Sequence, residues 1–189
     1  MNSKLRLIIA SNGIQVFAAT LLVPVFALFA QEIGGGPQLA GILFGISFIT
    51  TAVINLLIIR IHDRKLLDAT LFKVGLIVKA GAWTLLAIHQ SIPVLVITQI
   101  ILGISSAVGS PSFNSLMSGH LDKRLHISEW SRWDFIQNIA TGAASILSGY
   151  IIVGFGFATL FSIMAVVTLI AFLVALRITD HQPAFSEVR

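Results

Sequence analysis

The sequence predicts an all-α fold, a polytopic membrane bundle of six transmembrane helices. Of the 189 residues, 56% are hydrophobic and 11% are charged, whereas soluble domains average roughly 25% charged residues. The mean hydropathy is +0.94, and a water-soluble fold of this size could not bury so much apolar surface. Six apolar runs follow one another along the chain, each near the roughly 20 residues that a bilayer crossing requires.

Short polar or glycine-rich breaks separate the six runs, and residues 1–189 are interpreted as a single transmembrane domain. Because an unsatisfied backbone group costs several kcal/mol in hydrocarbon, each run is predicted to be helical. The first run is 24 residues long, longer than the apolar core of a signal peptide, so it is predicted to remain as a helix. The predicted helices cover about residues 7–30, 39–59, 69–89, 93–117, 131–153 and 157–178.

Lysine and arginine residues lie almost entirely on one side of these helices. The three breaks on the opposite side contain no lysine or arginine, and Glu32 is their only charged residue. Because basic residues favour the cytoplasmic side, both termini are predicted to be cytoplasmic, in a multi-pass protein of the plasma (inner) membrane. The expected partner is the lipid bilayer and not a nucleic acid, since the basic residues form no single face despite a net charge of +4. The basic residues on the cytoplasmic side are Lys4, Arg6, Arg60, Arg64, Lys65, Lys73, Lys123, Arg124, Arg132, Arg177 and Arg189.

The second predicted helix and the loop after it resemble the second helix and signature loop of the major facilitator superfamily. The helix begins with Gly41 and Gly45, and the loop runs through residues 60–67. The family signature is Gly-x-x-x-Asp-Arg-x-Gly-Arg-Arg on the cytoplasmic side, and Asp63 and Arg64 match its Asp-Arg pair. Its glycine and paired basic positions differ here and are occupied by Ile59, Leu66, Leu67 and Asp68.

Two later helices extend the resemblance over nearly the whole chain. Residues 99–111 are similar to the family's fourth helix, with Gln99 about where many members carry arginine. Residues 144–149 stand where drug–proton antiporters of the family carry Gly-Pro-x-x-Gly-Gly, and the proline is missing here. Family members usually pair two six-helix halves around a midplane site. This chain resembles the N-terminal half, which would consist of two inverted three-helix repeats.

The resemblance implies a secondary transporter that moves a small solute across the bilayer by alternating access. A single half leaves three arrangements open: a half-transporter that forms a homodimer, a half that needs a different second half, or a fragment of a larger transporter. A membrane scaffold that transports nothing needs only the helices, and it is the main alternative function.

Polar residues inside the predicted helices are the candidates for a solute cavity, because such residues are costly within a bilayer. The first helix carries polar residues before Pro24, and the fourth carries them before Pro111. Proline-interrupted helices at corresponding positions of two repeats point to a transport site, and the family's first and fourth helices line its central cavity. The alternative is that the serines bond their own backbone and the prolines only kink the helices. The candidates are Asn12, Gln15, Gln99, Ser106 and Ser110.

Lys79 is the only basic residue inside a predicted helix away from its ends. It lies ten residues from either end of the third helix, about 15 Å from either surface at about 1.5 Å per residue. No acidic residue lies at the same depth in the other helices. Lys79 could bind an anionic substrate, shuttle a proton, or hydrogen-bond Asn55 and backbone carbonyls. The peripheral place of the family's third helix favours the structural role.

A second group of charged residues is predicted to act in gating. In the resembling family, contacts of the signature loop latch the two halves in one state of the cycle, which implies this role for Asp63 and Arg64. Asp134 shares a face with Gln137 near the cytoplasmic end of the fifth helix. It could pair with Arg132 or with the signature loop.

Small residues spaced four apart occur in the second and fifth predicted helices. Gly41 and Gly45 form one pair, and Thr141, Ser145 and Gly149 form the other series. Such spacing permits close helix contacts, either within this half or with another half.

No enzyme activity, cofactor or metal site is expected. The chain has no cysteine, so thiolate metal sites and a cysteine nucleophile are excluded. No phosphate-binding glycine loop with lysine is present, and the loop histidines lack metal-ligand spacing.

Overall fold

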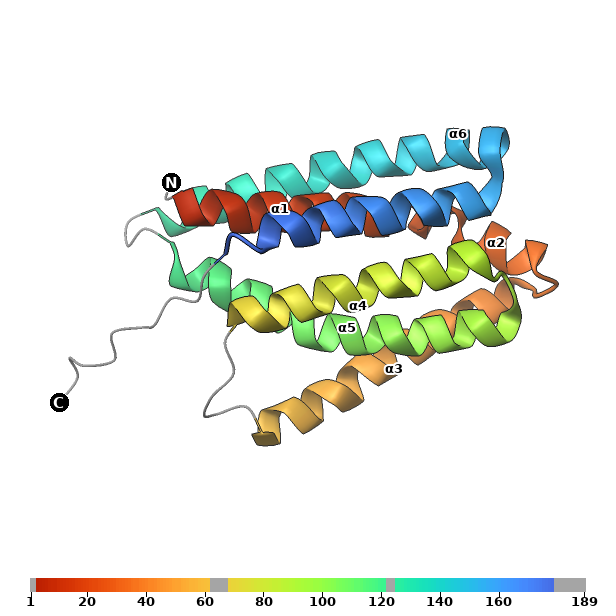
Figure 1. Ribbon diagram of the computed structural model, residues 1–189, viewed down its shortest axis with the longest axis horizontal. Coiled ribbons are helices and arrows are strands. Elements are labelled where there is room, and N and C mark those ends of the chain that lie inside the picture. Colours follow the sequence, from red (N-terminus) through yellow and green to blue (C-terminus); the bar gives the residue numbers. More distant parts are fainter. Residues whose placement is uncertain (1–2, 62–67, 122–124, 179–189) are drawn as a thin grey trace.

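The computed structural model describes residues 3–61, 68–121 and 125–178, with the side chains of residues 59–61 left out. All regular elements in these ranges are helical, and they run side by side along one long axis (Figure 1). The elements are α1 (Ser3–Thr20), the 3-10 helix η1 (Val23–Val25), α2 (Phe26–Glu32), α3 (Pro37–Ile61), α4 (Asp68–Ile88), α5 (Ile92–Gly119) and α6 (His126–Ala175).

The first predicted helix is interrupted where proline occurs. α1 ends at Thr20, and η1 contains Pro24 before α2 continues to Glu32. Proline has no backbone N–H and its ring clashes with the preceding turn, and the helix predicted over residues 7–30 is interrupted here. Together the three elements still form one apolar span of 30 residues.

The α6 segment is 50 residues long and is folded back on itself at Gly156. A straight helix of that length would extend ~75 Å, more than twice the roughly 30 Å of a bilayer core. Gly156 has φ 76° and ψ 177°, a backbone region that is essentially restricted to glycine. The predicted helices 131–153 and 157–178 therefore fall on two arms of α6, residues 126–155 and 157–175.

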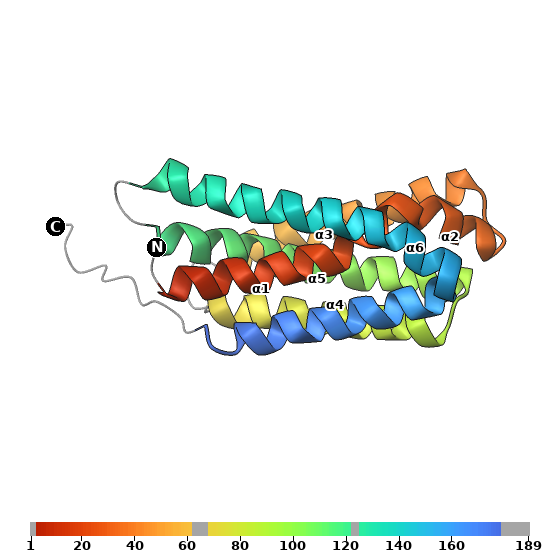
Figure 2. The same cartoon turned by 90° about the horizontal axis from the view of Figure 1, so that it is seen from above.

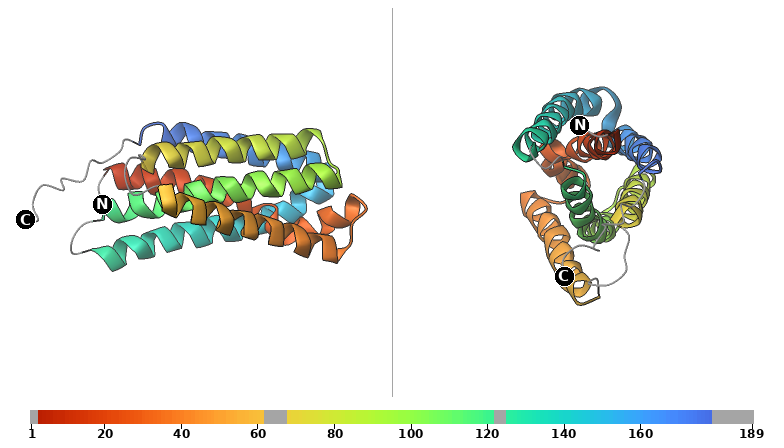
Figure 3. Two further views of the ribbon diagram at one scale, coloured as in Figure 1. Left: turned by 90° about the horizontal axis from the view of Figure 1, so that it is seen from below. Right: turned by 90° about the vertical axis from the view of Figure 1, so that its left-hand side faces the viewer.

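Five segments in the described ranges are long and apolar enough to cross a membrane, with α6 counted once. The prediction of an all-α membrane bundle is confirmed, whereas the count of six separate helices and their inverted repeats is not. α1 lies between the two arms of α6 (Figure 2). α4 packs against α5 and α6, while α3 packs mainly against α5 and is the outermost helix when seen end-on (Figure 3).

Two buried clusters occupy opposite ends of the bundle. The first lies near the start of α1 and includes Leu5, Phe113 and Trp133. The ring centroids of Phe113 and Trp133 are 4.8 Å apart. The second lies near Gly156 and includes Phe29 and Phe161, also 4.8 Å apart and in edge-to-face geometry. In lipid such packing holds helices together through van der Waals contact. Polar residues lie between the two clusters.

Close helix contacts form at glycines other than those predicted. A Cβ built on Gly75 of α4 would lie 3.0 Å from the Gly109 Cα of α5, and one on Gly103 of α5 would lie 2.7 Å from the Ser47 carbonyl oxygen of α3. By contrast, a Cβ built on the glycines of the predicted series meets no atom of another described helix within 4 Å. Those glycines are Gly41, Gly45 and Gly149.

Candidate functional site

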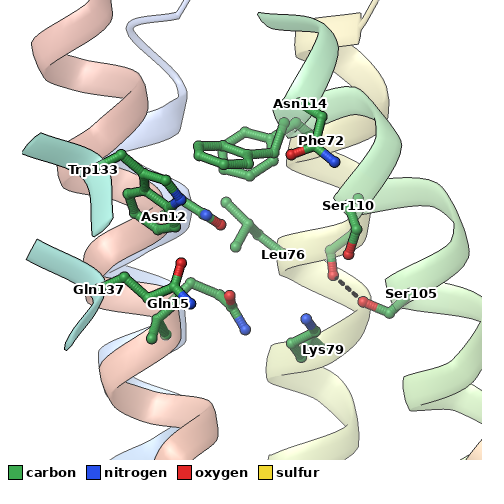
Figure 4. A pocket seen from close by; sticks show the side chains of 14 residues that line it. Asn12, Gln15, Phe72, Leu76, Lys79, Ser105, Ser110, Asn114, Trp133 and Gln137 are labelled. Atoms are coloured by element: carbon green, nitrogen blue, oxygen red, sulfur yellow. Dashed lines mark hydrogen bonds between the residues drawn. The ribbon is translucent and has the colours of Figure 1, made fainter. Parts of the chain in front are cut away.

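A polar cavity of about 250 Å³ lies between α1 and α6 on one side and α4 and α5 on the other (Figure 4). The amide of Gln15 and the ammonium of Lys79 point toward each other across it, and Gln137 lies beside Gln15. No acidic side chain lines this cavity in the described chain. Its polar lining residues are Asn12, Gln15, Lys79, Ser105, Ser110, Asn114 and Gln137.

A second, larger cavity of about 440 Å³ lies against α3, and we call it the aromatic cavity. Four aromatic residues line it, from α2, α3 and α4, and the rings of Phe26 and Phe44 have centroids 4.6 Å apart. Gln99 and Ser106 of α5 contribute polar groups. The aromatic lining residues are Phe26, Phe44, Phe48 and Trp83.

Lys79 and Ser110 line both cavities, and we call this shared position the junction. Lys79 is half-buried and is the only charged residue among the described lining residues of the two cavities. Within the described part of the chain it forms no ion pair and no hydrogen bond, including with Asn55. The hydrogen bond between Lys79 and Asn55 that a structural role predicted is therefore not observed. Helix α4, which carries Lys79, lines both cavities.

Local helix geometry explains why α5 lines both cavities. Gln99, Ser106 and Ser110 follow the three-and-four spacing that places residues on one helix face. Asn114, four residues after Ser110, continues this series and lines the polar cavity. The Ser105 hydroxyl donates to the Gly75 carbonyl at 2.6 Å (dashed line in Figure 4), which binds α5 to α4 beside the cavity.

Each of the six intramembrane candidates lines at least one of the two cavities, but neither cavity contains all six. Asn12 and Gln15 line the polar cavity, whereas Gln99 and Ser106 line the aromatic cavity. The two glutamines are both buried, with 8% and 4% of their surface exposed. Sequence reasoning missed Ser105, Asn114 and Trp133 as lining residues and did not select Gln137. Only Asn114 could have been found from spacing, as the next step of the α5 series.

Of the three predicted gating residues, the structure describes only Asp134. Asp63 and Arg64 fall outside the described residues. Asp134 is exposed, lines neither cavity, and makes no ion pair with Arg132 in the described structure. Its backbone carbonyl accepts a hydrogen bond from the Asn138 side chain at 2.8 Å.

A different carboxylate, that of Asp68, links two helices at the end of the bundle where α1 begins. The Ser115 hydroxyl of α5 donates to Asp68 Oδ2 of α4 at 2.5 Å. Asp68 stands in the first turn of α4, where a negative charge is favoured by the helix dipole. The sequence pattern distinguishes Asp68 only as a departure from the family signature.

Comparison with known proteins agrees with this architecture. The model of the Major Facilitator Superfamily matches residues 8–188, and no curated protein is similar to the chain. The fold is similar to that in the in meso crystal structure of the POT family transporter PepTSo, with a TM-score of 0.82 and 19% sequence identity. The similar region covers 97% of this chain and 39% of that one, so this chain spans less than half of that transporter. The family match points to a transporter and not to an enzyme, and the chain belongs to the Major Facilitator Superfamily.

Proposed function

We propose that the chain is a six-helix half of a secondary transporter that moves a small solute across the bilayer by alternating access. In this proposal the two arms of α6 cross the membrane separately. The span from α1 to α2, α3 and α4 then form one three-helix repeat, and α5 with the two arms of α6 forms an inverted second repeat. The family membership and the folded-back α6 support this arrangement.

The observation that carries the proposal is the junction of the two cavities at Lys79 and Ser110. Polar and charged side chains inside a bilayer are costly, and where they occur they usually face a cavity or a pathway. Here six such candidates line two adjoining cavities. A scaffold would require only helix packing, for which these polar linings are unnecessary.

The proposed orientation has both termini in the cytoplasm, in the plasma (inner) membrane. α1 begins and α6 ends at one end of the bundle, and the α4–α5 connection lies at the other. Described basic residues gather toward the first end, which is the pattern expected for the cytoplasmic side. These residues are Lys4, Arg6, Lys73, Arg132 and Arg177.

A second six-helix half completes the proposed transporter. Gly41, Gly45 and Gly149 offer small surfaces that nothing in the described chain covers, and only 6% of the α3 span is buried. Such surfaces permit close approach of another membrane helix. In a homodimer the second half is a copy of this chain, related by a two-fold axis along the membrane normal. The detergent-corrected protein mass, measured by light scattering, distinguishes a homodimer from a half that needs a different partner chain.

The test of alternating access uses the chain's freedom from cysteine. Ser110→Cys, in proteoliposomes with protein in one orientation, should react with an impermeant sulfonated methanethiosulfonate added to either side, because each side is reached in a different state. The matched control is Leu169→Cys on α6, which is exposed on the outer surface and lines neither cavity. It should stay unreactive.

Two outcomes would contradict the proposal. An unreactive Ser110→Cys from both sides indicates a packed bundle without a hydrated path, as in a scaffold. Reaction from one side only, under every condition, indicates a fixed pocket and excludes alternating access. Orientation is checked in the same preparation with Gln90→Cys and Gly119→Cys, which should react from opposite sides.

A further inference from the structure

From the two cavities we infer the class of solute, which is an amphipathic organic anion. Its anionic head group lies at the junction beside Lys79 and Ser110, and its apolar body fills the aromatic cavity. Movement of the anion across the bilayer rests on the proposed function, whereas binding of the anion does not require transport.

The charge argument begins with Lys79, which is the only charged residue lining either cavity in the described chain. It has no carboxylate partner there, and its position about 15 Å from either surface is too deep for its side chain to reach the interface. A cationic solute would add a second positive charge at the same place. An anionic solute instead supplies the missing counter-charge, in surroundings that screen charges poorly.

The hydrogen-bond groups at the junction also suit an anion. An ammonium group offers three donors and a serine hydroxyl one, and a carboxylate accepts several such bonds in charge-assisted geometry. The Ser110 hydroxyl makes no hydrogen bond within the described chain. The Gln15 amide, which points toward Lys79 across the polar cavity, adds further donors (Figure 4).

The aromatic cavity accounts for the apolar body. Its volume of about 440 Å³ falls within the usual range of about 300–1,000 Å³ for small-molecule pockets. Phe26, Phe48 and Trp83 supply flat apolar walls, and Lys79 stands at its edge toward the polar cavity. A molecule that spans from these rings to Lys79 therefore has an apolar body and one anionic end.

The experiment measures binding of 3-phenylpropionate to the full chain in nanodiscs by tryptophan fluorescence, since two of its three tryptophans, Trp83 and Trp133, line the two cavities. We expect saturable binding of 3-phenylpropionate. Three relatives should bind at least tenfold more weakly: 3-phenylpropionamide, which lacks the charge, 3-phenylpropylammonium, which reverses it, and propionate, which lacks the ring. These comparisons need no variant and so do not depend on the folding of one.

Substitutions then locate the site. Lys79→Gln should weaken 3-phenylpropionate binding at least tenfold and remove the preference over the amide, while Lys79→Arg should keep that preference. The matched control is Lys73→Gln in the same helix, which lines neither cavity and should leave binding unchanged.

The outcomes separate this inference from the proposed function. Equal binding of 3-phenylpropionate and its amide, or an unchanged preference in Lys79→Gln, would overturn the anion site whatever the transport result. Selective binding through Lys79 without uptake of 3-phenylpropionate into proteoliposomes, together with an unreactive Ser110→Cys, would keep the anion site and overturn the transporter.

Discussion

The polar and the aromatic cavity differ in what encloses them. The polar cavity lies among α1, α4, α5 and α6, and hydrogen bonds between helices fix its walls, such as the one from Ser11 to the Ala171 carbonyl at 2.8 Å. The aromatic cavity has α3 as its outer wall, and α3 packs mainly on α5, where the Thr51 hydroxyl donates to the Gly103 carbonyl at 3.1 Å. The polar cavity therefore lies inside the bundle, whereas the outer wall of the aromatic cavity is one peripheral helix that is held mainly by its contact with α5.

The largest effect is expected where the two cavities meet. Ser110→Trp places an indole at the junction, so it should fill part of both cavities and lower 3-phenylpropionate affinity by about a hundredfold, or roughly 2.7 kcal/mol. Titration in nanodiscs measures this change. Ser118→Trp, on an exposed part of α5 that lines neither cavity, is the matched control. Equal affinities of the two variants would show that Ser110 does not border the bound molecule.

The α3–α5 contact provides the next test. A Cβ on Gly103 would come within 2.7 Å of both the Ser47 carbonyl oxygen and the Thr50 Cβ, so Gly103→Ala must push α3 outward. We expect it to lower the free energy of unfolding by about 1–3 kcal/mol, measured by titration with a denaturing detergent. The substitution should also change the shape of the aromatic cavity more than that of the polar cavity.

Gly81→Ala is the matched control for that substitution, since Gly81 has open space around it in the described structure. A Gly103→Ala variant as stable as Gly81→Ala would show that α3 is held elsewhere. In variants that keep a single tryptophan, a change in the fluorescence of Trp133 without any change at Trp83 would contradict this expectation, because Trp133 lines the polar cavity and Trp83 the aromatic one.

The smallest effect concerns a single hydrogen bond beside the polar cavity. Ser105→Ala removes the 2.6 Å bond to the Gly75 carbonyl and should cost about 0.6 kcal/mol, the average for such bonds between membrane helices. Ser106→Ala, whose hydroxyl makes no hydrogen bond in the described chain, should cost less. If Ser106→Ala were the more destabilising of the two, the wall of the polar cavity would not depend on this bond.

Hydropathy predicted the membrane bundle because the length of an apolar run can be read directly from the sequence. The need to pair every backbone N–H and C=O group in hydrocarbon then makes each run helical. Helix ends agree with the predicted ranges to within a few residues for α3, α4 and α5. Pro24 was predicted to interrupt or kink the first helix, and the structure has a 3-10 turn there. The reversal at Gly156 falls in the predicted break between residues 153 and 157, and helical structure extends to it from both sides.

The site was only partly predictable, because spacing within one helix does not say which other helix it faces. The α5 series led to three lining residues, but the separation of Gln15 and Gln99 into two cavities depends on how α1 and α3 pack on α5. Gly75 and Gly109 meet across two helices, and no local pattern marks them. The spacing of Gly41 and Gly45 marked a surface that the described chain leaves open.

In the proposed topology, in which the two arms of α6 cross the bilayer separately, the connection at Gly156 has to cross the apolar core during insertion. Val153 and Phe155 are 91% and 73% exposed, and residues 149–160 contain no charged side chain. Carrying this segment across the apolar core therefore exposes no charge to hydrocarbon, which would cost about 2.5–3.5 kcal/mol for each lysine or arginine. The two arms of α6 can thus insert together as a helical hairpin, with the tip crossing first and the basic start of the segment, at Arg132, staying behind.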